Sequence, residues 1–347
     1  MMQTEEVKQI ILEAGACAAG IAPCEPVSDE DAQLYDSWIE NNHHGPLGYM
    51  TRYPDLRHNP ALLLEGSCAR SVIVAAFRYP SSTDLPYAPG GVRWARYAVG
   101  DDYHDVLRRR LTAATEKLAS LSDKTPAFRI TVDSAPMRER YWAWRAGVGI
   151  IGLNGQLIVP GIGSWVLLAT IVTDLSIAPT SPLSPSPSPA CLMCRRCVEA
   201  CPGHALDGHG GVDATRCLSC LTIENRDPEL TPEIAGYLRA SGRLYGCDIC
   251  QEVCPMGVPS PSANRADSTD NGSTGFIGVI PELRPRAGLL TLTPEDLRLM
   301  DQSTFSATFA RSAIKRTKLA GLRRNAGSPL PPSPTSTSST PTSDEHA

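Results

Sequence analysis

The chain has 347 residues, of which 42% are hydrophobic and 20% charged, as in a globular protein that buries one large core or two smaller ones. Its formal net charge of −5 argues against a protein that coats nucleic acid over its whole surface. No apolar run approaches the roughly 20 residues of a membrane span, and the acidic N-terminus does not resemble a secretory signal. A cytoplasmic, monomeric protein without membrane contact is therefore expected.

The first half of the chain alternates predicted helices with predicted strands. Apolar residues at helical spacing predict the helices, and short β-rich apolar runs predict buried strands. In chain order these are a helix over 4–15, a helix over 28–39, a strand over 71–77, a helix over about 104–118, a strand over 128–132, a helix over 137–146 and a strand over 165–173. The alternation predicts an α/β domain over residues 1–178, within an overall α/β or α+β fold.

Asp133 is the best candidate for chemistry in this first half. It comes directly after the predicted strand 128–132 and before Pro136, a residue suited to the first turn of a helix. A carboxylate at the end of a strand lies where α/β sheets usually place their ligands. The same Asp-Ser-Ala-Pro sequence also fits an ordinary helix N-cap, so the local sequence leaves both interpretations open.

Five further segments follow residue 178. Their compositions indicate a stiff proline-rich linker, a cysteine-rich module, a loop rich in polar residues and glycine, a basic helical segment and a Ser/Thr/Pro-rich tail. The predicted boundaries are 179–190 for the linker, 191–262 for a ferredoxin-like double [4Fe–4S] module, 263–280 for a flexible loop, 281–325 for the helical segment and 326–347 for a disordered tail.

Nine of the twelve cysteines lie between residues 191 and 254, at spacings typical of metal ligands. The run C-x2-C-x2-C-x3-C-P is that of bacterial ferredoxins, in which the fourth cysteine binds the other of two [4Fe–4S] clusters. A second run, C-x2-C-x3-C-P, ends the segment and needs one more ligand. The pattern predicts Cys191, Cys194, Cys197 and Cys254 as ligands of one cluster and Cys201, Cys217, Cys247 and Cys250 as ligands of the other.

The sequence leaves alternatives open for the kind of metal site, for one of its ligands and for the class of protein. A pair of zinc sites also uses C-x2-C spacings, but the unbroken first run and the eight assignable thiolates favour iron–sulfur clusters. Cys220 could replace Cys217 as a ligand, although a thiol without a metal is the favoured interpretation. Clusters alone transfer single electrons, and the preceding domain predicts a second cofactor or substrate site; a simple electron-transfer protein is the competing hypothesis.

The segment 311–324 is strongly basic. It contains six positive charges and no acidic residue, at Arg311, Lys315, Arg316, Lys318, Arg323 and Arg324. Such a run fits either a solvated helix face or a surface that contacts phosphates, and the density of charge favours phosphates.

Several motifs together resemble the epoxyqueuosine reductase family, whose members complete queuosine at the wobble position of certain tRNAs. The resemblance spans about residues 5–325. It rests on the complete cysteine set and on the motifs DLRHNP at 55–60, YAVGDDYH at 97–104, VDSAP at 132–136, GVG at 147–149, GSW at 163–165, CLSCLTIE at 217–224, YGCD at 245–248 and KRTK at 315–318.

This resemblance implies properties that the spacings alone do not. Residues 1–178 would bind cobalamin, like the related domain of reductive dehalogenases, and the two clusters would reduce its cobalt. Asp133 would be the proton donor, and burial against the corrinoid would raise its pKa. Arg57, Tyr97 and Asn154 match positions near the corrinoid, and Arg140 matches one that faces the tRNA.

The expected function is therefore that of an epoxyqueuosine reductase-like oxidoreductase, acting on tRNA with cobalamin and two [4Fe–4S] clusters. Its electrons would come from a low-potential donor such as flavodoxin or ferredoxin. Family members usually have Gly-Lys-Asn-Thr where this chain has Gly152-Leu153-Asn154-Gly155, and many continue into a helical-repeat domain. These differences indicate the alternative, a related corrinoid reductase that acts on a small molecule.

Overall fold

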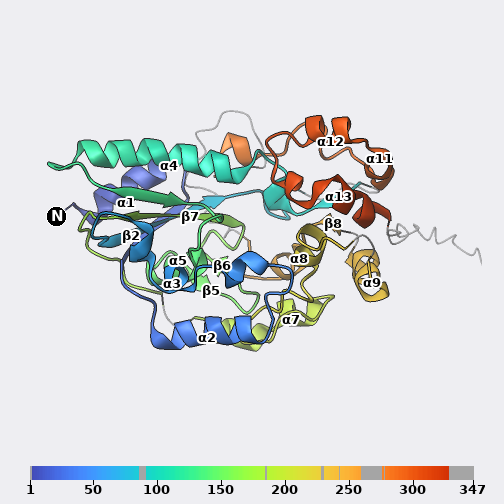
Figure 1. Cartoon of the computed structure of the whole chain (residues 1–347), viewed down its shortest axis with the longest axis horizontal. Helices are drawn as coiled ribbons and strands as arrows, with labels where there is room; N and C mark the ends of the chain where they lie inside the picture. The colour runs from blue at the N-terminus through green and yellow to red at the C-terminus, as the bar shows by residue number, and fades with distance from the viewer. Residues whose placement is uncertain are drawn as a thin grey trace, which may run out of the picture.

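A computed structural model of the chain describes residues 2–85, 91–183, 186–227, 230–241, 243–258, 276 and 278–327 (Figure 1). Most of the predicted loop 263–280 and nearly all of the predicted tail 326–347 lie outside these residues.

A four-stranded sheet forms the centre of the first half. Its strands are β1 (Ala18–Pro23), β2 (Ser71–Arg78), β4 (Phe128–Thr131) and β7 (Val166–Thr173), in the order β1-β2-β7-β4. Every neighbouring pair is antiparallel, and the β2–β7 ladder runs from Ser71 opposite Thr173 to Arg78 opposite Val166. The expected mixture of helices and strands is present, but the antiparallel pairing means that the carboxyl ends of the strands do not gather at one edge.

Helices cover both faces of this sheet. On one face α1 (Thr4–Glu13) and α4 (Tyr103–Ser120) pack on the odd-numbered residues of β2, such as Ile73 and Phe77. On the other face α5 (Glu139–Arg145) packs on the even-numbered residues, such as Val74. Figure 1 shows α1 and α4 above the sheet and α5 below it. β2 is buried along its whole length because both of its faces are covered, which explains its continuous apolar sequence.

Shorter elements connect the sheet to the cysteine-rich module. They are α2 (Asp29–Glu40), η1 (Gly48–Thr51), α3 (Pro54–His58), η2 (Pro60–Leu63), η3 (Arg96–Ala98) and the hairpin of β5 (Ile150–Ile151) and β6 (Leu157–Ile158). The Ser28 side chain caps α2 by accepting a hydrogen bond from the Asp31 N–H. The Trp38 indole on α2 donates to the Val212 carbonyl at 2.7 Å and so joins this layer to the module.

The cysteine-rich module consists of short helices and one strand. These are α6 (Pro189–Cys194), α7 (Arg196–Ala200), α8 (Leu218–Ile223), α9 (Pro232–Ser241), β8 (Arg243–Tyr245) and α10 (Ile249–Glu252). β8 pairs in parallel with β3 (Arg93–Trp94), far away in sequence. The buried Arg96 guanidinium also bonds Asp248 and Glu252 of the module, at 3.3 and 2.6 Å. Pairing and buried charges thus tie the module to the first half of the chain.

The C-terminal segment completes the same core. Its elements are η5 (Pro281–Leu283), α11 (Pro294–Leu299), α12 (Gln302–Thr308), η6 (Ala313–Thr317) and α13 (Lys318–Gly327). Phe309, Ile314 and Leu322 are fully buried in one cluster with Trp94 and Tyr245. Within the described ranges, no helix is both long and apolar enough to cross a membrane.

Candidate active site

Asp133 lies in a tight turn directly after β4. Its backbone has φ 55°, in the left-handed region that Asp tolerates better than most residues. The Asp133 N–H donates to Glu139 Oε1 at 3.0 Å, which fastens the turn to the start of α5. The helix begins at Glu139 after Arg138, without a side-chain cap, so Asp133 is not its N-cap. The turn presents the Asp133 side chain to solvent, 64% exposed.

The start of α4 supplies the hydrogen-bond partners of this carboxylate. Asp133 Oδ2 accepts from the Tyr103 hydroxyl at 2.7 Å and lies 3.3 Å from His104 Nε2. On the other side of the imidazole, Nδ1 lies 2.7 Å from Asp102 Oδ1. Asp102 is the N-cap of α4, and its side chain also accepts from the His104 N–H. A helix terminus thus holds a tyrosine and a histidine rigidly against the candidate acid.

The two carboxylates stabilise the charged form of His104. Burial lowers its pKa, but the bonds to Asp102 and Asp133 outweigh this effect and raise the pKa to about 9. For Asp133, burial raises the pKa, but the bonds from His104 and Tyr103 and the charge of Arg140 hold it below its ordinary value. At neutral pH the proton of this pair therefore resides on His104. The rise expected from burial against a corrinoid would have to overcome these partners.

Glu139 is a second acid beside Asp133 that the sequence did not suggest. Burial, with the neighbouring charge of Asp133, raises the pKa of Glu139 to about 8. Two adjacent carboxyl groups therefore have pKa values displaced in opposite directions, a pattern typical of sites that move protons. The one signal for this contact in the sequence is the position of Glu139, six residues after Asp133 and near the start of a helix.

The pairing of His104 predicts a pH dependence of stability. A histidine whose folded pKa is about 9, against 6.5 unfolded, contributes stability below pH 6.5 that is lost as the pH rises through 9. After a discount for the exposure of Asp133, we expect this contribution to be about 1 kcal/mol. Anaerobic unfolding midpoints measured across this range should fall more for the natural protein than for His104→Gln. Equal pH slopes for the two proteins would contradict the assignment.

The four residues that the family resemblance places near a corrinoid or tRNA do not share one environment. The Tyr97 ring packs edge-on against Tyr103, with centroids 5.8 Å apart, and the exposed Arg140 contributes its charge to Asp133. The buried Arg57 donates to the Tyr49 carbonyl at 2.9 Å and to another carbonyl of the same loop. The buried Asn154 lies on the side of the cysteine module. Its amide donates to a carbonyl of that module, at Cys250, at 3.3 Å.

Four of the module's thiols influence one another on the side of α6. Burial, together with the nearby thiols Cys191 and Cys254, raises the pKa of Cys197 to about 11. Burial also raises the pKa of Cys254, and Cys191 and Cys194 add to the rise. The Leu153 N–H donates to Cys191 Sγ at 3.3 Å, a contact that stabilises a thiolate.

The other four thiols form a second group. Burial raises the pKa of Cys250, with additional effects of Cys247, Cys217 and Cys201. Burial likewise raises the pKa of Cys217, and the charge of Arg140, which also acts on Asp133, partly offsets the rise. Throughout the described part of the chain, no three His, Cys, Asp or Glu side chains meet around one point as ligands of a single metal ion.

Cys220 is buried on α8, close to both Cys217 and Glu224. Burial, together with the charges of Cys217 and Glu224, raises its pKa to about 12.

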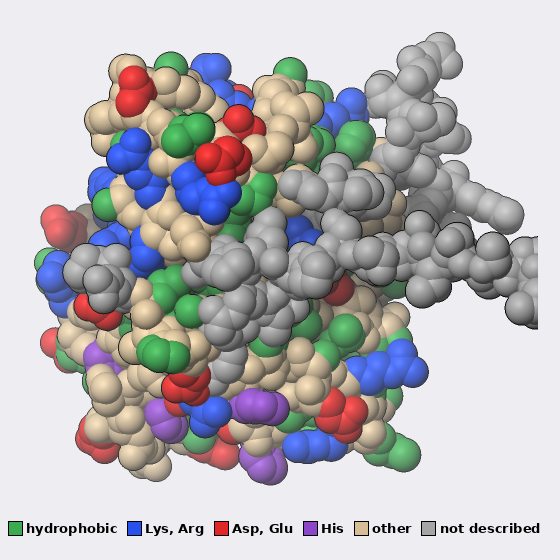
Figure 2. All heavy atoms as spheres, turned by 90° about the vertical axis from the view of Figure 1, so that its right-hand side faces the viewer, with side chains coloured by type: hydrophobic (Ala, Val, Ile, Leu, Met, Phe, Trp, Pro, Cys, Tyr) green, Lys and Arg blue, Asp and Glu red, His purple; other side chains and the backbone are tan. Residues whose placement is uncertain are grey.

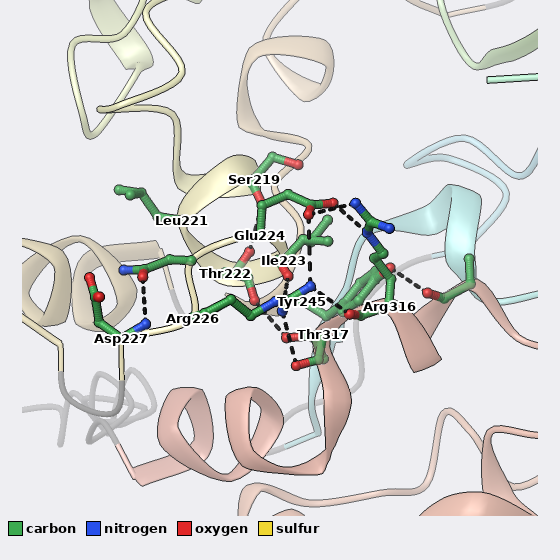
Figure 3. A network of polar contacts seen from close by, with 12 residues as sticks. Ser219, Leu221, Thr222, Ile223, Glu224, Arg226, Asp227, Tyr245, Arg316 and Thr317 are labelled. Carbon is green, nitrogen blue, oxygen red and sulfur yellow. Dashed lines mark hydrogen bonds and ion pairs between the residues drawn. The ribbon is translucent and has the colours of Figure 1, made fainter. Parts of the chain in front are cut away.

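A polar network joins the cysteine module to the basic C-terminal segment (Figure 3). Glu224 binds the Arg316 guanidinium through both oxygens, at 2.8 and 2.9 Å, and Arg226 donates to the carbonyls of Arg316 and Thr317. Arg316 also lies over the Tyr49 ring, at 5.8 Å. Since Asp133 and Glu224 both act on the Tyr49 hydroxyl, this network borders the candidate site.

The architecture now defines a class of protein. Residues 190–257 match the family model described as a 4Fe-4S double cluster binding domain, so the chain is an iron–sulfur protein that joins this module to a mixed α/β domain. Residues 57–134, which end just after Asp133, match the model described as "Epoxyqueuosine reductase QueG, DUF1730".

Similarity over nearly the whole chain identifies the family. The chain is 35% identical over 324 residues to the epoxyqueuosine reductase of Cyclobacterium marinum, covering 93% of this chain and 95% of that protein. It is 36% identical over 310 residues to that of Synechocystis, covering 88% and 98%. The chain belongs to the epoxyqueuosine reductase family.

Solved structures agree with this assignment. A crystal structure of epoxyqueuosine reductase with an epoxyqueuosine-modified tRNA-Tyr stem loop superposes with a TM-score of 0.76 and 27% identity, over 93% of this chain and 79% of that one. The Bacillus subtilis enzyme, with its catalytic aspartate loop swung out of the active site, has a TM-score of 0.75 and 27% identity over the same shares.

Proposed function

We propose that this protein reduces epoxyqueuosine to queuosine in tRNA, with a bound cobalamin and two [4Fe–4S] clusters. The observation that carries the proposal is the hydrogen-bonded series Asp133–His104–Asp102, in a chain that also contains a double-cluster module. Relatives that align over nearly their whole length are described as epoxyqueuosine reductases, and one similar crystal structure contains an epoxyqueuosine-modified tRNA stem loop.

The thiol groups support two clusters with the ligands that the ferredoxin spacing predicts. Cys191, Cys194, Cys197 and Cys254 would hold one, and Cys201, Cys217, Cys247 and Cys250 the other. Backbone N–H groups already donate to Cys191 and Cys201, as they do to the sulfurs of protein-bound clusters. Such bonds lower the charge on sulfur and help to set the reduction potential.

The surroundings of Asp133 also fit a flat corrinoid. Asp133 uses Oδ2 for Tyr103 and His104, yet its side chain is largely exposed. Its charge also raises the pKa of the Tyr49 hydroxyl. Arg57, Tyr97 and Asn154 are proposed to hold the cofactor, on the strength of the family resemblance. When bound, cobalamin would supply a cobalt centre that receives electrons from the clusters.

The chain's own residues would supply the protons. Removal of the epoxide oxygen as water consumes two electrons and two protons. Asp133 donates a proton to the departing oxygen, and His104, protonated at neutral pH, restores it through the 3.3 Å contact between Nε2 and Oδ2. Asp102 fixes the orientation of the imidazole. Displacement of water by cofactor and substrate would raise the pKa of Asp133 and favour its acid form.

Complementation tests the proposed substrate. We expect that expression of this chain in a bacterium without its own reductase converts the epoxyqueuosine of its tRNA into queuosine. Mass spectrometry of the digested nucleosides measures this conversion. Persistent epoxyqueuosine, although the expressed protein carries cobalamin and both clusters, would contradict the proposal and support the small-molecule alternative.

The basic segment supports contact with tRNA in part. Arg316 and Arg324 bind groups of the protein itself. Arg316 binds the Glu224 carboxylate, and Arg324 donates to the carbonyls of Asn225 and Asp227. Lys315 and Lys318 are exposed near the Arg316 network. Figure 2 views the right-hand side of Figure 1 and shows basic side chains interspersed with carboxylates in its upper half, where α11–α13 lie.

Substitution of both lysines tests this contact. We expect Lys315→Ala with Lys318→Ala to weaken binding of an anticodon stem-loop RNA and to reduce the slope of log affinity against log salt by about 1–2, since each phosphate contact releases counterions. Titrations at several salt concentrations measure the slope. Arg298→Ala, which removes an exposed charge already paired with Glu295, is the matched control. An unchanged slope in the double variant would exclude these lysines from the interface.

A further inference from the structure

We propose that electrons enter the protein at a surface formed by Leu192, Met193, Arg195 and Arg196, where an acidic electron-carrier protein docks. We call this the α6–α7 surface. The inference rests on the proposed function only in requiring that the thiol groups hold reducible clusters; it needs no particular final substrate.

Two apolar side chains form the centre of the α6–α7 surface. Met193 is 86% exposed and Leu192 is 44% exposed, which is unusual for large apolar residues next to each other. Both lie between Cys191 and Cys194, so that the backbone that turns these thiols inward turns the intervening side chains outward. Methionine is flexible and polarisable, and it is enriched in the cores of protein interfaces. An apolar contact therefore lies one residue away from two predicted cluster ligands.

Charged groups at the edge of this centre indicate the kind of partner. Arg195 and Arg196 are both exposed, and Glu199 is the acidic residue on the same short helix. Arg195 lies between α6 and α7 with φ 49°, and its guanidinium is held by the Gly208 carbonyl at 3.4 Å. The segment is thus locally positive, although the whole chain has a charge of −5. An apolar centre with a positive edge complements an acidic protein whose redox group lies near its surface.

The two thiol groups lie in the right order for entry at this surface. Cys247, in the second group, closely follows β8, whose Tyr245 hydroxyl lies 3.4 Å from that of Tyr97. The Tyr97 ring packs against Tyr103, which donates a hydrogen bond to Asp133. The second group is therefore on the side of the active site. The first group contains Cys191 and Cys194, which flank the exposed Leu192 and Met193. An electron that arrives at the α6–α7 surface would meet the first group before the second.

The proposed step is the transfer of one electron from the carrier to a cluster. One electron leaves the reduced centre of the carrier, which becomes oxidised by one electron, and the cluster held by the first thiol group is reduced by one electron. No covalent bond forms or breaks. Two successive encounters supply the two electrons of the reaction. Electron-transfer complexes are typically small, below about 1,200 Å² of buried surface, so two apolar residues and two arginines are an adequate contact.

The test compares a protein donor with a small reductant. The anaerobic holoprotein is mixed with reduced flavodoxin, an acidic flavoprotein, and the loss of cluster absorbance gives the second-order rate constant. We expect Met193→Glu to lower this constant about tenfold or more, because it places a like charge in the contact. Reduction by dithionite, which needs no docking surface, should be unchanged. Leu299→Glu on α11, where the leucine is 73% exposed, is the matched control and should behave as the natural protein does.

A second variant makes the test independent of cluster damage. Arg196→Glu should also slow reduction by flavodoxin and should weaken the dependence of the rate on salt, since it removes an attractive charge. If Met193→Glu slows dithionite as well, Arg196→Glu decides the question. Rates with flavodoxin equal to that of the natural protein in both variants, or no reduction of the natural protein by flavodoxin, would overturn the proposal. Because no tRNA is present, a failure here is distinct from a failure of the complementation experiment.

Discussion

Asp133→Asn is expected to reduce turnover of epoxyqueuosine in tRNA by about 10²–10⁴-fold, the usual contribution of a positioned general acid. Asparagine is nearly the same size and can still accept the hydrogen bond from Tyr103, so the turn after β4 should survive. It cannot donate a proton of suitable acidity to the departing oxygen. Single-turnover assays with pre-reduced protein would measure the chemical step without a contribution from the electron donor.

Controls separate lost chemistry from lost structure. The variant should keep its cluster absorbance and its cobalamin, both of which are measured by absorption spectroscopy. Asp123→Asn, at an exposed position after α4, is the matched control and should retain full activity. A fully active Asp133→Asn protein would show that another group, with Glu139 as the first candidate, donates the proton.

The fold was predictable from local patterns, but the pairing of its strands was not. The continuous apolar run 71–77 and the run 165–173 correspond closely to β2 and β7, because each is a buried strand. Nothing within either run indicates that they pair antiparallel. Strand direction depends on how the connections cross the sheet, which local composition does not encode.

The candidate site shows the same limit. Asp133 could be recognised because it follows a strand, but its partners could not be assigned. His104 lies 29 residues earlier and was equally consistent with a structural role. Its contact with Asp133 exists because α4 begins beside the end of β4, and Glu139 reaches the same turn only because Asp133 adopts a left-handed conformation. Such contacts arise from tertiary packing.

For the basic segment, the number of positive residues only partly indicates how many are available to bind phosphates. The sequence shows six positive residues, whereas the structure uses Arg316 to bind Glu224 and Arg324 to bind backbone carbonyls. A guanidinium satisfied by internal carbonyls stabilises the protein and is less available to phosphates. The spacing of the cysteines was more informative, because the ligands of a ferredoxin-like module are set by local sequence.

Cys217 and Cys220, three residues apart, allow a direct test of the proposed cluster ligands. Cys217→Ala should remove a ligand of the second cluster, so that iron content falls from about eight to about four atoms per chain and turnover is lost. Electron transfer from the clusters toward the active site would then be interrupted, because Cys217 is a proposed ligand of the second cluster. Iron analysis and low-temperature paramagnetic resonance of the reduced protein measure the loss.

Cys220→Ala is the matched control, three residues later on α8, of which Cys217 is the N-cap residue. It removes a buried thiol of the same size, so a general cost of replacing cysteine by alanine in this part of the fold should appear in both variants. We expect it to retain both clusters, because the spacing of the cysteines supplies eight ligands without Cys220. Loss of iron from Cys220→Ala with retention in Cys217→Ala would exchange the two assignments. Loss from both would indicate that Cys220 supports the cluster through its contact with Cys217.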